Sequence, residues 1–151
     1  MNRIVCAASL ALALAAPVCA QGATPKRACA MVTRTDVEHV LGWHVDSARE
    51  KRYDVMGRTG AMCFLEAHDG VVTVTIPDPG SGFPGMTAFN TTDTQLVRTV
   101  PTAGATVALF NSTVYVSRHG IDVSVRAIGN DRVASYSDVE PFAKVVIARI
   151  K

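Results

Sequence analysis

Four cysteines are the residues of this chain with the widest choice of chemistry, because a thiol can act as a nucleophile, a metal ligand or half of a disulfide. Cys6 and Cys19 lie in the first twenty residues, whereas Cys29 and Cys63 lie 34 positions apart in the rest of the chain. A C-x-x-C spacing would favour a redox or metal site, and an even pair in an oxidising compartment favours a disulfide. We therefore predict a Cys29–Cys63 disulfide, with a reactive or metal-binding thiol pair as the alternative.

The start of the chain indicates the compartment. Residues 1–20 have a short basic beginning, an apolar Ala- and Leu-rich stretch and a final Val-Cys-Ala, as in a secretory signal peptide. We expect cleavage after Ala20, and lipoprotein processing at Cys19 is the alternative. The mature protein is then periplasmic or secreted, which is the setting where a disulfide persists.

The remaining 131 residues suit a single domain with a hydrophobic core. We expect residues 21–28 to be a polar, flexible lead-in and residues 29–151 to form one domain. Fourteen basic residues against thirteen acidic ones give no electrostatic case for a nucleic-acid partner. No second long apolar run follows, so no transmembrane segment is expected in the mature chain.

Other motifs that could carry chemistry are incomplete. The four histidines show neither H-x-x-x-H nor H-E-x-x-H spacing, and no G-x-S-x-G nucleophile motif occurs. Gly80, Gly82 and Gly85 spell G-x-G-x-x-G, but Pro84 interrupts the helix that a dinucleotide would need. We expect no metal, no cofactor and no catalytic activity, with a small hydrolase as a remote alternative.

Two groups of residues are predicted to form a binding surface. Basic side chains cluster between residues 49 and 58, where they could meet anionic lipid, peptidoglycan or an acidic protein; a solvated sheet edge is the alternative. A Gly- and Pro-rich loop, residues 77–90, carries apolar side chains that could anchor a partner or fold back onto the core. The candidates are Arg49, Lys51, Arg52 and Arg58 in the first group and Phe83 and Met86 in the second.

Helices are predicted near both ends of the domain. Thr33 is a good N-cap with Asp36 three residues later, and Gly42 is a natural stop for this first helix. Near the C-terminus, Ser137 and Glu140 read as a capping box ahead of apolar residues at helical spacing.

Alternating apolar and polar residues predict strands between the two helices. Turns are expected at Gly57–Gly60, 68–70, 111–112 and 119–120, whereas residues 86–104 suggest a short helix near 86–90 and little order beyond. The strands are 43–55, 61–67, 71–76, 105–110, 113–118 and 121–128. We therefore predict an α+β fold, in which an antiparallel sheet of about five to six strands carries the N- and C-terminal helices on one face.

The segment "CAMVTRTDVEHVLG" is similar to the C-x-L-L-T-x-x-[DE]-V-x-x-x-L-G opening of a family of small exported proteins and lipoproteins of unknown function, best known from actinobacteria. Met31 and Val32 stand in place of the two leucines. A second cysteine precedes a strand in that family, as Cys63 does here.

Further along, "VPTAGATVAL" resembles the family's V-x-G-x-G-x-x-A segment, with Val100 and Gly104 in place and Thr102 where a glycine is usual. The final "FAKVVIARI" resembles its closing helix. The resemblance implies an antiparallel α+β fold with a disulfide, like the Mog1/PsbP group, and it provides no catalytic residues.

These features favour an exported, non-catalytic binding module whose partner is an envelope protein or a cell-wall component. An inhibitor or immunity protein against a cell-envelope hydrolase is the alternative function.

Overall fold

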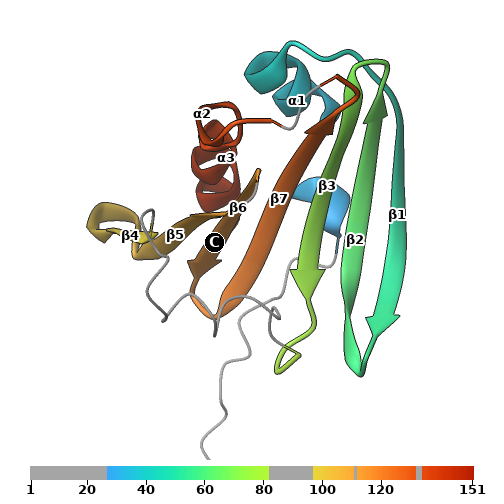
Figure 1. The fold of residues 1–151 in the computed structure, drawn as a ribbon. Coiled ribbons are helices and arrows are strands. Elements are labelled where there is room, and N and C mark those ends of the chain that lie inside the picture. Colours follow the sequence, from blue (N-terminus) through green and yellow to red (C-terminus); the bar gives the residue numbers. More distant parts are fainter. Residues whose placement is uncertain (1–26, 82–96, 111, 132–133) are drawn as a thin grey trace, which may run out of the picture.

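One antiparallel sheet of seven strands forms the framework of the protein (Figure 1). The computed structural model describes residues 27–81, 97–110, 112–131 and 134–151. In chain order the strands are β1 (Val45–Val55), β2 (Arg58–Ala67), β3 (Gly70–Pro77), β4 (Val97–Val100), β5 (Ala105–Phe110), β6 (Thr113–Arg118) and β7 (Ile121–Gly129). Across the sheet their order is β1-β2-β3-β7-β6-β5-β4.

The sheet consists of two meanders that meet at β3 and β7. Strands β1, β2 and β3 pair consecutively on one side, and β4, β5, β6 and β7 pair consecutively on the other. The antiparallel pairing of β3 with β7 joins the two meanders. All six strands expected from the alternating pattern are present, because each is long enough to show its period of two.

Strand β4 is a seventh strand, which corrects the prediction of little order up to residue 104. Its four residues pair with β5, and a 3-10 turn at Pro101–Ala103 (η3) follows. Gly104 ends that turn with a φ of 58°, a left-handed conformation that glycine adopts without strain. A four-residue strand is too short to show a pattern in sequence. The expected helix near 86–90 lies outside the described residues.

The turn between β1 and β2 is shorter than predicted. Met56 and Gly57 form it with φ values of 54° and 75°, as in a two-residue type I′ hairpin. Gly60 lies inside β2, so its prediction as a turn residue is wrong. A Cβ at Gly60 would collide with the carbonyl oxygen of Ile76 and lie 2.6 Å from the ring of Tyr53, so this glycine allows a close approach.

Helix α1 (Arg34–Leu41) begins and ends where the sequence predicts. The Thr33 hydroxyl accepts a hydrogen bond from the Asp36 N–H, and the Asp36 carboxylate accepts from the Thr33 N–H at 2.6 Å. Gly42 ends the helix in the left-handed region with a φ of 73°.

The C-terminal helix is divided into α2 (Tyr136–Val139) and α3 (Pro141–Arg149). The predicted Ser137–Glu140 capping box is wrong, because the chain enters α2 two residues earlier. There the Ser135 N–H donates to the Asp138 carboxylate at 2.8 Å. Pro141 starts α3, since proline lacks an N–H and is tolerated in a first turn. All the helices of the described residues are short, so the sheet dominates the fold more than the predicted α+β class implies.

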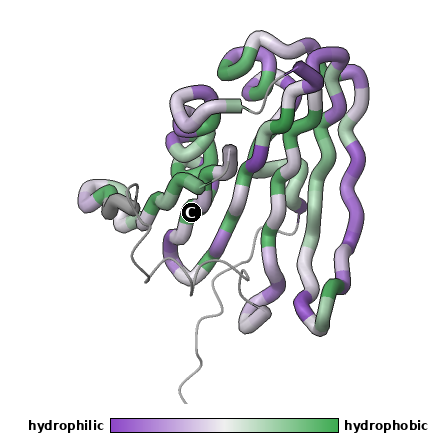
Figure 2. Tube along the Cα trace, viewed as in Figure 1, coloured by the Kyte–Doolittle hydropathy of each residue, from purple (hydrophilic) through white to green (hydrophobic). Residues whose placement is uncertain are grey.

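The core fills the space between the helices and one face of the sheet. Buried side chains of β3, β6 and β7 alternate with mostly polar ones along each strand, as the colours of Figure 2 indicate, whereas β2 also has apolar residues, Met62 and Phe64, on its other face. Figure 1 shows α1, α2 and α3 gathered together beside the upper part of the sheet. The buried side chains of these helices include Val37, Val139, Phe142 and Val146, which belong to the same hydrophobic cluster as the buried strand residues. The N- and C-terminal helices therefore cover one face, as predicted.

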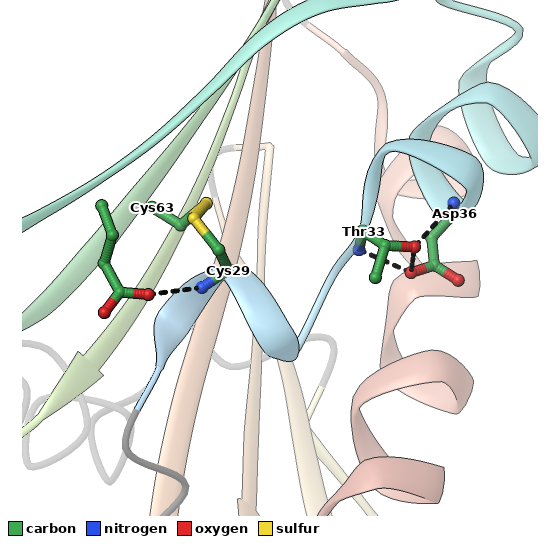
Figure 3. The surroundings of a disulfide bond; sticks show 5 residues. Cys29, Thr33, Asp36 and Cys63 are labelled. Atoms are coloured by element: carbon green, nitrogen blue, oxygen red, sulfur yellow. Dashed lines mark hydrogen bonds between the residues drawn. A yellow bond between two sulfur atoms is a disulfide. The ribbon is translucent and has the colours of Figure 1, made fainter.

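The predicted disulfide joins Cys29 to Cys63, with a distance of 5.0 Å between their Cα atoms (Figure 3). Cys29 lies in a short 3-10 helix, η1 (Ala28–Ala30), and Cys63 lies in the middle of β2. The Cys29 N–H also donates to a carboxylate oxygen of Glu50 on β1, at 3.0 Å. On the chain-entropy model, closing a loop of this length stabilises the fold by about 3–4 kcal/mol. The crosslink therefore holds the start of the domain against the core face.

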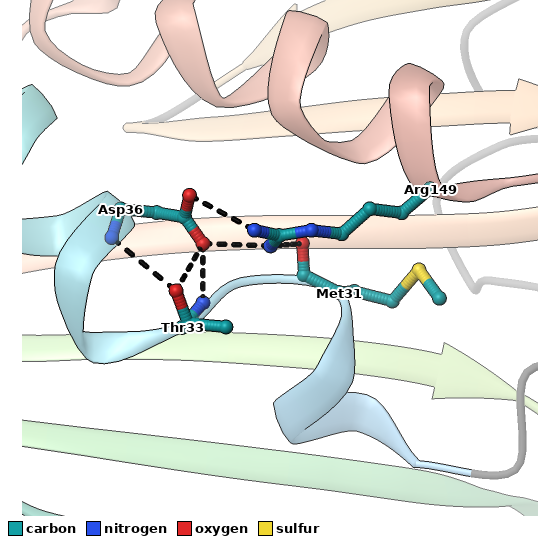
Figure 4. A network of polar contacts seen from close by, with 4 residues as sticks. All are labelled: Met31, Thr33, Asp36 and Arg149. Carbon is teal, nitrogen blue, oxygen red and sulfur yellow. Dashed lines mark hydrogen bonds and ion pairs between the residues drawn. The ribbon is translucent and has the colours of Figure 1, made fainter.

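A second link ties the two ends of the domain together (Figure 4). The Arg149 guanidinium, at the end of α3, donates to both carboxylate oxygens of Asp36, at 2.6 and 3.0 Å, and to the Met31 carbonyl at 2.7 Å. Burial raises the pKa of the Asp36 carboxyl, but hydrogen bonds from Arg149 and Thr33 outweigh this effect, so its pKa lies below 3.8. The same carboxylate thus caps α1 and binds α3.

Arg118 provides a similar link at the C-terminus of α3. Its Nη1 atom donates to the carbonyl oxygens of Ile147 and Ile150, at 2.6 and 2.7 Å. Both carbonyls belong to the last turn of the helix, where the chain itself supplies no donor. A cation at this end is favoured by the helix dipole, so Arg118 fixes α3 to β6.

Replacement of Asp36 tests the link between α1 and α3. We expect Asp36→Asn to lower the free energy of unfolding at neutral pH by about 2 kcal/mol, because Arg149 loses its ionic partner in a half-buried site. The folded-state pKa is lowered, so this stabilisation is complete above the ordinary value of 3.8 and disappears as the pH falls through the folded-state pKa. Urea unfolding between pH 2 and 7 would measure both effects.

Asp54→Asn, at an exposed position, is the control and should change stability by less than about 0.5 kcal/mol. Equal stability of the Asp36 and Asp54 variants would contradict the assigned link.

Candidate functional site

The face of the sheet opposite the core carries polar and charged side chains from several strands of the described part of the chain. We call it the helix-free face, because η1, α1, α2 and α3 contribute their buried side chains to the core on the other side. Successive side chains of a strand alternate between the two faces. On β2 this places Phe64 beside solvent while its neighbours Cys63 and Leu65 are buried.

Two neighbouring rows of side chains cross this face from β1 to β7. Residues in register on adjacent strands repeat the same order of chemistry: a basic side chain on β1, an apolar one on β2, a threonine on β3 and a polar one on β7. With strands about 4.8 Å apart, each row is roughly 14 Å long. We call these rows the double row, and its members are Arg49, Phe64, Thr73 and Arg126 in the first row and Lys51, Met62, Thr75 and Ser124 in the second.

The double row carries an excess of positive charge. Arg49, Lys51 and Arg126 are exposed, and Glu66 is the one acidic residue that contacts them through an ion pair with Arg49 in the described structure. The Ser47 hydroxyl donates to the Glu66 carboxylate at 2.8 Å. Hydrogen bonds from Ser47 and from Arg49 lower the pKa of Glu66, so it stays ionised and holds the Arg49 side chain in place. Three cations and one anion leave a charge of +2 on the double row and Glu66 together.

The predicted basic cluster is divided between the two faces of the sheet. Arg49 and Lys51 lie on the helix-free face, but Arg52 points to the other side and forms two hydrogen bonds with Asp78, one of them at 3.0 Å. These bonds and one from Thr59 lower the pKa of Asp78. Arg58 begins β2 just after the hairpin turn. Arg52 therefore ties β1 to the end of β3 and does not join the same surface as its neighbours.

Several members of the double row were not among the sequence candidates. Phe64, Thr73 and Arg126 come from three different strands, and pairing between β3 and β7 aligns residues more than fifty positions apart. The alternation of each strand indicates which residues point to solvent, but nothing local indicates which strands are neighbours. The other two candidates, Phe83 and Met86, lie outside the described residues.

A second feature is the tip of the β1–β2 hairpin, residues 55–58. The side chains of Val55 and Met56 are 60% and 96% exposed. Met56 has a φ of 54°, a left-handed conformation that is costly for a residue with an ordinary side chain. Pairing of β2 with β3 reaches only from Ala67 to Gly60, so the tip extends past the end of β3. An apolar tip in a strained turn is not explained by the packing of the fold.

In the part of the chain that the structure describes, no group of three or more His, Cys, Asp or Glu residues could hold a metal ion. Cys29 and Cys63, the two cysteines of the described residues, are joined to each other. None of the described helices is long and apolar enough to cross a membrane.

Comparison with known proteins adds no assignment, since no family model, no curated protein and no solved structure matches this chain.

Substitution of Met56 tests the strain in the hairpin tip. We expect Met56→Asn to raise the free energy of unfolding by about 0.5–1 kcal/mol, because asparagine tolerates the left-handed conformation of a type I′ turn. Thermal and urea unfolding would measure the gain. Asp54→Asn places the same side chain two residues earlier, where φ is negative, and should bring no gain. Loss of stability in the Met56 variant would show that this turn is not strained in solution.

Proposed function

We propose that this protein is an exported binding module without catalytic activity, and that it binds its ligand through the helix-free face. The double row is the observation that carries the proposal, because it combines a net positive charge with apolar and hydroxyl groups on the face that the described helices leave uncovered. Among its members only Ser124 is buried. The signal-like start of the sequence and the Cys29–Cys63 disulfide support an oxidising compartment outside the cytoplasm. A cell-envelope or extracellular partner follows from that compartment.

Arg126 argues for binding and against a simple solvated edge. Charged side chains on β1 have a structural explanation, because charge on an edge strand discourages pairing with another chain. Strand β7 is the fourth of seven in the sheet and has a neighbour on both sides, so it needs no such protection. An exposed arginine in its middle, in line with Phe64 and Arg49, is a feature of the surface and not of the edge.

Charge reversal on the helix-free face tests this proposal. We expect the double variant Lys51→Glu, Arg126→Glu to lose the envelope component that the wild type captures, because four units of charge change on one surface. The matched control is Arg34→Glu, Lys144→Glu, which changes the same charge at exposed positions of α1 and α3. The measurement is capture from envelope extract, quantified by mass spectrometry, with circular dichroism to verify folding. Identical captured components for the variant and the control would reject the helix-free face as the binding surface.

An inhibitor of an envelope hydrolase is the second candidate function, and the hairpin tip favours it. A projecting turn with exposed Val55 and Met56 has the form of a segment that enters the cleft of another protein, where apolar side chains gain most from burial. The strain at Met56 fits a residue retained for contact and not for stability.

The two candidate functions depend on different residues. We expect Val55→Asp, Met56→Asp to abolish inhibition if the hairpin tip enters a hydrolase, since two carboxylates would have to be buried. Peptidoglycan hydrolysis by an envelope extract, followed with and without each variant, would measure this. The Lys51 and Arg126 variant is the control, and its inhibition should equal that of the wild type. A lack of inhibition by the wild-type protein would end this alternative.

A further inference from the structure

We propose that the double row binds an anionic polysaccharide, a chain of sugars that carries carboxylate groups, laid across the strands β1, β2, β3 and β7. The inference rests on the proposed function and assigns the chemical class of the ligand. It follows from the spacing of the cations, the groups between them and the depth at which those groups lie.

The cations stand at the ends of the first row and at one end of the second. Arg49 and Arg126 are in the same row, roughly 14 Å apart across three strand intervals. Lys51 lies two residues from Arg49 on the same face of β1. A polyuronate carries a carboxylate on each sugar of a stiff chain, so sugars a few units apart can place carboxylates at both ends of a row. Such a ligand can therefore meet both ends of the row at once.

Arg49 is held ready for an incoming carboxylate. Its ion pair with Glu66, and the bond from Ser47 to the same carboxylate, fix the guanidinium above the sheet. A guanidinium has five N–H donors, and the ion pair uses only one of its terminal nitrogen atoms. The remaining donors can form a bidentate contact with a second carboxylate, which a lysine could not do.

The groups between the cations suit sugar rings. Phe64 is partly exposed, so its ring offers a flat apolar surface on which the C–H face of a sugar can stack. Thr73 and Thr75 are the next residues along the two rows, and their hydroxyls can both donate to and accept from sugar hydroxyls. Charge alone would not require an aromatic ring and two hydroxyls in register between the cations.

The depth of the apolar groups argues against a lipid surface. Phe64 and Met62 are partly buried, whereas the longer side chains of Arg49, Lys51 and Arg126 are exposed around them. Insertion into a bilayer needs apolar groups that project beyond the charges. A ligand that lies within the face can contact both kinds of group, and an extended polysaccharide does so.

The experiment compares three soluble polymers by affinity electrophoresis or calorimetry with the disulfide-bonded protein. Polygalacturonate is an anionic polysaccharide, dextran is a neutral one, and poly-glutamate carries carboxylates without sugars. We expect binding to polygalacturonate that weakens as the salt concentration rises, with at least fivefold weaker binding to poly-glutamate and none to dextran. Lys51→Glu, Arg126→Glu should reduce the affinity for polygalacturonate about tenfold or more.

Two further variants separate the contributions. Phe64→Leu keeps an apolar side chain and removes the ring, and we expect about threefold weaker binding to polygalacturonate with little change for poly-glutamate. The matched control, Arg34→Glu, Lys144→Glu, should bind polygalacturonate as the wild type does. Intact disulfide mass and unchanged thermal unfolding would verify that each variant is folded.

Three results would overturn the assignment to an anionic polysaccharide. They are equal binding to poly-glutamate and polygalacturonate, no binding to polygalacturonate, and a charge-reversal variant that binds as tightly as the wild type. The first would point to an acidic protein as the partner. If capture from envelope extract still depends on Lys51 and Arg126, the binding function stands and only the ligand class fails.

Discussion

Both meanders of the sheet depend on the pairing of β3 with β7. Residues 70–75 meet residues 124–129 there, and no other pair of the described strands connects the two halves. Val72 and Val74 lie beside Ala127 and Val125 in the core, and this apolar match selects the register. A shift by one residue would turn Val125 to solvent and Arg126 into the core. The register that the core requires is therefore also the one that places Arg126 in line with Thr73, Phe64 and Arg49.

The disulfide and the Arg149–Asp36 ion pair both lie on the core side of the sheet and not on the helix-free face. The disulfide fixes η1 to β2, and Arg149 joins the end of α3 to the capped start of α1. Both act on the core side, where short helices would not be stable alone. Because the helices are restricted to that side, none of those described covers the double row. The stabilising groups and the proposed binding groups thus occupy separate faces, and substitutions in one set need not disturb the other.

Local features of the sequence predicted local features of the fold. Six strands, the Thr33–Asp36 cap, the Gly42 stop and the disulfide followed from alternation, capping chemistry and compartment. The errors arose where two local signals compete or where contacts are distant. Ser135, and not Ser137, caps α2 together with Asp138, and Gly60 serves a close approach to Tyr53 inside a strand. Arg126 was missed because strand order is set by packing across the whole chain.

The charged run of β1 shows how one strand can serve both faces. Glu50 points to the core side and accepts from the Cys29 N–H, while Arg52, two residues on, binds Asp78 at the end of β3. These two residues attach the edge strand to its neighbours. Arg49 and Lys51 alternate with them and point the other way, toward the helix-free face. The charged run of β1 appears uniform in sequence, but its side chains alternate between the two faces of the sheet. Half of it holds the strand in place, so that the other half can be presented to a ligand.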